Sequence, residues 1–177
     1  ELHFGTAPPL SPAAVAGARD RVITIVSFSK SLGLAGWRLG FLAARGGLVA
    51  EVLKIQDCSV ICAARAGQEG LLAALPGIDE HVMRLRNVLR ERRDRLVAAL
   101  RAADLGAFIE PAGSLFLFLN LPGAGDDRAF CDRLLEQHSV VAVPGSVFGP
   151  GGEGSVRLSY GSTAPERLDE VGGRIAA

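Results

Sequence analysis

Apolar and polar residues alternate with two different periods along the 177-residue chain. Short apolar runs rich in β-branched and aromatic residues predict strands, whereas longer stretches with apolar residues three or four positions apart predict helices. The runs typical of strands are Arg21–Phe28, Arg38–Ala44, Ser114–Leu121, Val140–Pro144 and Ser155–Tyr160. The first of them has no polar alternation, which is typical of a parallel-sheet strand that is covered on both faces.

Helical periodicity is strongest between Asp79 and about Ala103. Apolar residues recur there at helical spacing, with arginines and acidic residues between them, and this spacing predicts one long amphipathic helix. Its apolar positions are Val82, Leu85, Leu89, Leu96 and Leu100. We expect Asp79 to be the N-cap of this helix and Gly106 to stop it.

The remaining elements set the expected fold class. Further helices are predicted near Leu48–Gln56, Ala63–Leu75, Asp127–His138 and from Ala164 onward. After Asp79 the elements follow in the order αβαββα, which is enough for a compact unit. Before it, two or three strands without elements to cover them look like part of a larger parallel sheet. We therefore expect an α/β protein with a domain division between residues 1–78 and 79–177.

Composition excludes several classes of function. The chain has 19 basic and 19 acidic residues and a formal net charge of zero, so nothing points to nucleic acid or to an acidic membrane. No apolar run approaches the roughly 20 residues of a membrane helix. The three cysteines are an odd number, which indicates free thiols in a reducing cytoplasm. Cys58 and Cys62 have no second pair or nearby histidine, so we expect no metal site.

The stretch VSFSKSLGLAGWRLGF, Val26–Phe41, carries the candidate chemistry. Lys30 ends an apolar run there, and desolvation of such an amine favours the neutral form that adds to an aldehyde. Hydroxyl groups and one guanidinium nearby are the donors that a phosphate monoester needs. They belong to Ser27, Ser29, Ser31 and Arg38. Together these groups suggest pyridoxal phosphate. Spacing alone, however, favours a solvated lysine and arginine at the ends of a strand-loop-strand unit, because single lysines and arginines are common.

The segment SFSKSLGLAGWRLGF closely resembles the lysine segment of the class I/II aminotransferases, which belong to the aspartate aminotransferase superfamily of fold-type-I pyridoxal-phosphate enzymes. The family pattern is Ser-x-x-Lys, then Gly, then Gly-Trp-Arg-x-Gly, and every element is present. The resemblance implies that Lys30 forms the Schiff base with the cofactor and later shuttles a proton. It also implies that Ser27 and Arg38 hold the cofactor phosphate, while Trp37 packs.

A second match lies in VVAVPGSVFGPGGEGSVRLSYG, Val140–Gly161, which resembles the C-terminal segment of the same family. There the resemblance implies that Arg157 grips the substrate α-carboxylate. The stretch PAGSLFLFLNL fits the family's Pro-x-Gly strand as well. The glycine-rich GPGGEG has no following Lys-Ser/Thr, so it is not a nucleotide P-loop, and we expect a flexible connection that positions Arg157.

The resemblance also implies an architecture. Residues 1–78 would be the C-terminal part of the cofactor-binding large domain, with its mainly parallel sheet, and residues 79–177 the small C-terminal domain with the long interdomain helix. Family members run to roughly twice this length, so we expect that an N-terminal half is missing and required. The chain alone should then aggregate or be inactive. We also expect a homodimer.

The implied activity is transfer of an amino group between an amino acid and a 2-keto acid, with pyridoxal 5'-phosphate as cofactor. Three alternatives stay open. One is another reaction on the same scaffold, such as that of a C–S lyase, an aminocyclopropane-carboxylate synthase or a decarboxylase. Another is a non-catalytic aminotransferase-like module of a transcription regulator. The last is a structural fragment without cofactor.

Overall fold

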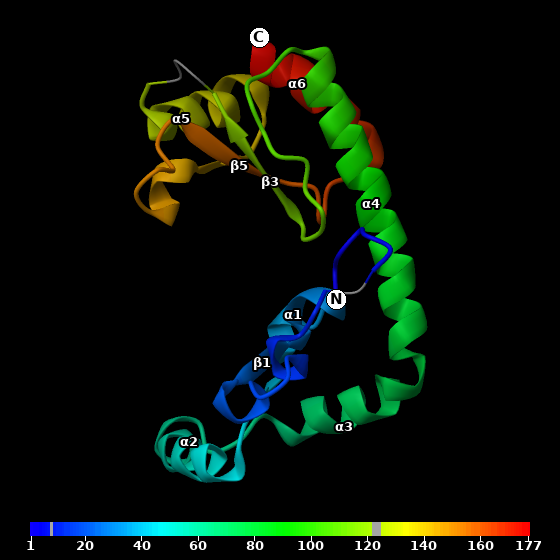
Figure 1. Ribbon diagram of the computed structural model, residues 1–177. Coiled ribbons are helices and arrows are strands. Elements are labelled where there is room, and N and C mark those ends of the chain that lie inside the picture. Colours follow the sequence, from blue (N-terminus) through cyan, green and yellow to red (C-terminus); the bar gives the residue numbers. More distant parts are fainter. Residues whose placement is uncertain (8, 122–124) are drawn as a thin grey trace. The chain divides into compact units, whose positions relative to one another are not determined.

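A computed structural model describes residues 1–7, 9–121 and 125–177. These residues form two compact units (Figure 1). The first unit comprises Glu1 and 6–85, and the second comprises Leu2–Gly5 and Arg86–Ala177. Within the described ranges, no helix combines the length and the apolar character that crossing a membrane requires.

The first unit is built from short elements around one pair of strands. The strands are β1, Thr24–Ser27, and β2, Gly40–Ala43, and the two longer helices are α2, Gly46–Ser59, and α3, Arg65–Ala74. Among its described residues, the unit also contains one short helix, α1, and four 3₁₀ turns: α1 Phe28–Ser31, η1 Pro12–Ala14, η2 Arg19–Arg21, η3 Ala35–Trp37 and η4 Leu75–Gly77.

Strands β1 and β2 pair antiparallel, with Ser27 opposite Gly40 and Thr24 opposite Ala43. The sequence predicted strands of a parallel sheet in this region, so the direction of this pair differs from the expectation. Parallel neighbours need a long crossover, whereas the connection between β1 and β2 folds back through two short helical turns. The expected cover on both faces is also absent from the described residues, because Ile25 is 76% exposed.

Helix α4, Ile78–Ala102, is the long amphipathic helix that the sequence predicted. It begins directly after η4, so Asp79 lies in its first turn, and the expectation that Asp79 is the N-cap is wrong. The end of the helix agrees with the sequence, since Asp104 and Gly106 both adopt a positive φ just beyond it. A side chain at position 106 would also collide with the carbonyl of Asn120.

The second unit contains one antiparallel sheet with strand order β3-β5-β4. Strand β3 spans Phe116–Asn120, β4 spans Val143–Pro144 and β5 spans Ser155–Ser159. Two helices and one 3₁₀ turn accompany the sheet: α5 Asp127–His138, η5 Gly145–Phe148 and α6 Pro165–Ala176. With α4 in front, this is the αβαββα order that the sequence predicted.

The core of this unit lies on one face of the sheet. The buried sheet residues form cross-strand pairs, Leu117 with Leu158 and Leu119 with Val156. Buried leucines of α4 and α6 complete the core: Leu89, Leu96, Leu100 and Leu168. Tyr160 is fully buried and its hydroxyl donates to the carbonyl of Gly113 at 2.9 Å. Burial raises the pKa of this phenol to about 12, so it stays a neutral donor.

Candidate active site

The lysine segment begins where β1 ends. Ser27 is both the last residue of β1 and the N-cap of α1, and its Oγ accepts a hydrogen bond from the Ser29 N–H at 3.2 Å. This cap turns the chain out of the strand within one residue. Lys30 follows in the turn and is exposed. The amide of Phe28 donates to the carbonyl of Leu39 at 3.2 Å, which closes the base of the β1–β2 connection.

Arg38 occupies the other end of this connection, just before β2. Its backbone is left-handed, with φ 54° and ψ 46°, a conformation that costs energy for a side chain other than glycine. One guanidinium N–H donates to the Ala35 carbonyl at 2.9 Å. The guanidinium has five N–H donors, so this single bond leaves donors for an anion.

Two glycines make the close packing of this segment possible. A Cβ at Gly40 would lie 2.6 Å from the carbonyl oxygen of Val26, so only glycine lets the two strands pair here. A Cβ at Gly70 of α3 would lie 2.8 Å from the Trp37 ring. Trp37 therefore rests on the backbone of α3, in agreement with the packing role that the sequence suggested for it.

The residues present fit the phosphate and the aldehyde of pyridoxal phosphate. Ser27 uses its oxygen as an acceptor, which leaves its hydroxyl hydrogen to donate, and Arg38 retains free guanidinium donors. Lys30 lies between Ser27 and Arg38 in the sequence and is exposed. Beside it, the Ser31 Oγ is buried and has no hydrogen-bond partner among the described residues. A buried unpaired hydroxyl is costly, and a polar group bound nearby would relieve that cost.

Arg157 belongs to the second unit. It lies on β5 opposite Phe118 of β3 and Val143 of β4, on the sheet face away from the leucine core. Its guanidinium carbon lies 4.3 Å from the ring centre of Phe116 and 4.8 Å from that of Phe148. Its Nε is buried and meets no hydrogen-bond partner within residues 1–7, 9–121 and 125–177. This unused donor suits a carboxylate oxygen.

The turn before β5 is fixed by an aspartate that sequence reasoning missed. Asp127, the first residue of α5, accepts hydrogen bonds from the Ser146 backbone N–H at 2.7 Å and from its hydroxyl at 2.9 Å. These hydrogen bonds, the backbone one above all, lower the pKa of the buried Asp127 carboxyl. Asp127 thus holds η5, which carries Phe148.

The glycine-rich segment leading into β5 was predicted to be a flexible connection. It has three positive-φ residues, Gly149, Gly151 and Gly154, and hydrogen bonds close it as a turn. The amide of Gly152 donates to Gly149 at 3.1 Å, and that of Ser155 donates to Gly152 at 3.2 Å. A side chain at Gly152 would collide with the Gly145 carbonyl, so the turn is packed against η5.

The predicted site residues therefore form two groups. The first group lies at the β1–β2 connection of the first unit and comprises Ser27, Lys30 and Arg38. The second group is Arg157 alone, which lies on β5 in the sheet of the second unit. Sequence reasoning missed Phe116, Phe148 and Asp127. A signal for Phe116 was present, because phenylalanine and leucine alternate along β3 and alternation assigns them to opposite sheet faces.

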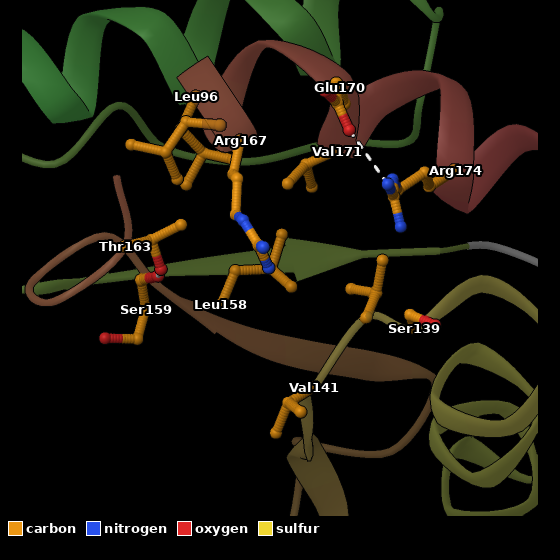
Figure 2. A pocket seen from close by; sticks show the side chains of 12 residues that line it. Leu96, Ser139, Val141, Leu158, Ser159, Thr163, Arg167, Glu170, Val171 and Arg174 are labelled. Carbon is orange, nitrogen blue, oxygen red and sulfur yellow. Dashed lines mark hydrogen bonds and ion pairs between the residues drawn. The ribbon is translucent and has the colours of Figure 1, made fainter. Parts of the chain in front are cut away.

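A pocket of about 250 Å³ in the second unit lies apart from Arg157 (Figure 2). It lies between α6 and the sheet, with Leu96, Leu158 and Val171 among its apolar lining. Arg174 on its rim is engaged, since it pairs with Glu170 at 2.8 Å and donates to the His138 carbonyl at 3.0 Å. None of the predicted site residues lines this pocket.

Comparison with known proteins relates the chain to one family. The model of the family "Aminotransferase class I and II" matches residues 2–175. The chain is 34% identical over 169 residues to an LL-diaminopimelate aminotransferase from Oleidesulfovibrio alaskensis, covering 96% of this chain but 43% of that protein. It thus spans less than half the length of this relative.

Solved structures agree with this relationship. The aromatic aminotransferase from Pyrococcus horikoshii matches 99% of this chain and 47% of its own with a TM-score of 0.91 and 31% identity. LysN, an α-aminoadipate aminotransferase from Thermus thermophilus, matches 99% of this chain and 46% of its own with a TM-score of 0.87 and 28% identity. That structure contains N-(5'-phosphopyridoxyl)-L-leucine. The α/β fold class predicted from the sequence is confirmed.

Proposed function

Since the chain belongs to the class I and II aminotransferase family, we propose that the protein containing it is a pyridoxal-phosphate-dependent aminotransferase. It moves an amino group between an amino acid and a 2-keto acid. The observation that carries this proposal is the connection between β1 and β2, which starts after Ser27 and carries both Lys30 and Arg38. Members of the family generally depend on pyridoxal phosphate, and LysN supports the same cofactor here.

When bound, pyridoxal phosphate supplies an aldehyde for an amine and a ring that takes up negative charge from the substrate carbon. Ser27 would donate its hydroxyl hydrogen to the phosphate, and Arg38 would neutralise the phosphate charge with the guanidinium donors that Ala35 leaves free. The left-handed backbone at Arg38 aims this side chain, and the strain there is consistent with a functional position.

Lys30 provides the amine that bonds the cofactor, and it afterwards acts as the base and acid of the reaction. Its Nζ would take the proton from the substrate α-carbon, hold it as the ammonium proton, and give a proton back later in the transfer, so that the amine ends neutral again. Lys30 lies within the capped turn and is exposed, so the described residues do not provide the desolvation that the sequence suggested for its amine.

Arg157 binds the substrate α-carboxylate. Its planar guanidinium presents parallel N–H groups that match the two oxygens of a carboxylate. The buried Nε without a partner in the described part of the chain supports this role, because a carboxylate oxygen would satisfy it. Arg157 thereby orients the substrate through the α-carboxylate, which all amino acids share. The side chain of the substrate is contacted by other groups.

The architecture that accompanies this proposal divides the chain at residue 78. Residues 1–78 form part of the cofactor-binding large domain, and residues 79–177 form the small domain. The curated relatives are more than twice as long as the match, which supports a further segment that completes the large domain. We propose a homodimer as the working enzyme and a cytoplasmic location, in keeping with the unpaired cysteines.

The test uses the full-length protein loaded with pyridoxal phosphate. Lys30→Ala should remove the visible absorbance of covalently held cofactor and lower transamination by at least about 10³-fold, since the base and the covalent link are both lost. Lys54→Ala is the matched control, because Lys54 is the chain's other lysine and pairs with Glu51 on α2. Reduction with borohydride followed by peptide mapping should label Lys30 and leave Lys54 unlabelled.

Product analysis completes the test. L-aspartate, L-glutamate and L-phenylalanine are each offered with a keto acid acceptor, and new amino acid is measured. Amino-group transfer distinguishes an aminotransferase from a lyase or a decarboxylase on the same scaffold. An unchanged cofactor spectrum in Lys30→Ala would contradict the proposal.

A further inference from the structure

Two phenylalanines contact the guanidinium of Arg157 in the second unit. Phe116 on β3 lies 4.3 Å from its central carbon, and Phe148 at the end of η5 lies 4.8 Å from it. Both distances are within the range in which an arginine stacks on an aromatic ring. The rings come from elements on either side of β5, since the strand order is β3-β5-β4 and η5 directly follows β4.

The two rings are themselves held in place. Phe148 meets Phe118 of β3 edge-on, with ring centres 5.7 Å apart and an interplanar angle of 74°. The turn that carries Phe148 is fixed by the hydrogen bonds from Ser146 to Asp127. Phe116 is fixed by the ladder between β3 and β5, opposite Ser159. Contacts with two rings restrict the rotation of the Arg157 guanidinium.

The donors of Arg157 are therefore restricted in direction. Stacked rings cover the faces of a guanidinium and leave its edge, where all of its N–H groups point. The Nε on this edge is buried and has no partner in the part of the chain that the structure describes. The other N–H groups of this half-buried side chain point from the same edge, in the plane of the guanidinium.

We propose that Phe116 and Phe148 are positioning residues that hold the Arg157 guanidinium between their rings, so that this site takes a planar carboxylate and discriminates against tetrahedral oxyanions. The inference rests on the proposed role of Arg157 in binding the α-carboxylate. A carboxylate lies in the guanidinium plane with both oxygens paired. A phosphonate also presents two oxygens, but its third oxygen leaves that plane towards space that a ring occupies.

The first experiment follows the Nε–H signal of Arg157 by nuclear magnetic resonance in the full-length protein. Acetate serves as the planar probe and methylphosphonate as the tetrahedral one. Acetate should bind about tenfold more tightly than methylphosphonate in the wild type. Phe116→Leu and Phe148→Leu should reduce that ratio to about threefold or less, a change in line with the loss of one stacking contact.

Two further variants separate positioning from general damage. Phe148→Tyr keeps a flat ring and should restore the acetate preference. Phe130→Leu is the matched control, because Phe130 also lies beside an arginine, 5.6 Å from the Arg133 guanidinium carbon, but on α5. It should leave the acetate preference unchanged. Thermal unfolding of every variant shows which of them are folded at the temperature of the titration.

Steady-state kinetics with the most active donor give a second readout. Loss of either ring should raise KM for the donor by about tenfold while kcat changes by less than about threefold. An α-aminophosphonate analogue of that donor should gain in relative affinity in both leucine variants.

The outcomes separate the two proposals. If transamination is absent but the acetate preference depends on the rings, the proposed activity fails and the positioning role stands. If transamination proceeds but the leucine variants keep the wild-type ratio of acetate to methylphosphonate, the positioning role is overturned. Equal binding of both anions by the wild type, or an equal effect of Phe130→Leu, would overturn it as well.

Discussion

The positions of the candidate site residues are fixed by neighbouring residues and by the backbone. Lys30 depends on the Ser27 cap at the start of its turn, and Arg38 depends on a left-handed backbone that few arginines adopt. The Arg157 guanidinium contacts Phe148, which is carried by a turn that Asp127 fixes. Substitutions at Phe148 or Asp127 can therefore disturb the candidate site without removing any group that binds cofactor or substrate.

Asp127 makes the second unit sensitive to acid. Its pKa is lowered in the folded protein, so its contribution to stability is fully present above the pKa of the unfolded chain and is lost as the pH falls through the folded value. Asp127→Asn should lower the urea midpoint at pH 7 and make the midpoint vary less below about pH 4. Asp132→Asn, at an exposed position on the same helix, is the control. Equal pH profiles for wild type and Asp127→Asn would contradict this assignment.

In the second unit, each strand packs against the core with one of its two faces. The strands β3 and β5 alternate between leucines or valine on the core face and phenylalanines or Arg157 on the other. Helix α6 lies so close to α4 that Gly172 meets the Ala99 backbone. The next residue, Gly173, has open space around its Cα. Helix α6 thus has two adjacent glycines, one packed against α4 and the other with open space where a side chain would begin.

These glycines give a sharp prediction for the packing of α4 and α6. Gly172→Ala should destabilise the protein by about 1–3 kcal/mol, because a Cβ there collides with the Ala99 carbonyl. Gly173→Ala should be neutral or stabilise by up to about 1 kcal/mol, because alanine favours helix and meets no neighbour. Urea unfolding of both variants measures the difference. A Gly172→Ala protein as stable as Gly173→Ala would show that the two helices do not pack this closely.

At the scale of the whole molecule, the two units differ in how well they bury apolar surface. The second has a core of fully buried leucines and Tyr160. The first leaves large apolar side chains in solvent, with Ile25 76%, Ile61 72% and Ile55 70% exposed. Exposed apolar surface on this scale is typical of a region that another segment or chain covers. The chain covers less than half of the solved aminotransferase structures that it matches.

A protein made of residues 1–177 alone should therefore bind a hydrophobic dye strongly and form aggregates. The full-length protein should bind the dye several-fold less, because the exposed face of the first unit is then covered. Dye fluorescence and size-exclusion chromatography at matched concentration measure both effects. A monodisperse chain of 177 residues with full transaminase turnover would contradict this prediction, and with it the need for a further segment.

The sequence determined the type and order of most elements, since their periods are local properties. Helix α5 was predicted at its observed bounds, Asp127–His138, and α4 within a residue or two. The start of α4 was missed at Asp79, because η4 runs into the helix and makes a cap unnecessary. The direction of the β1–β2 pair was also missed, because pairing joins residues that no local pattern relates.

For the candidate site, the sequence supplied Ser27, Lys30, Arg38 and Arg157 through motifs whose members lie close together along the chain. Only the tertiary structure revealed that the rings of Phe116 and Phe148 contact the Arg157 guanidinium and that Asp127 fixes the turn carrying Phe148. Local patterns report the period of a chain and its reactive groups. The contacts that aim those groups arise from residues far apart in sequence, and folding alone brings these together.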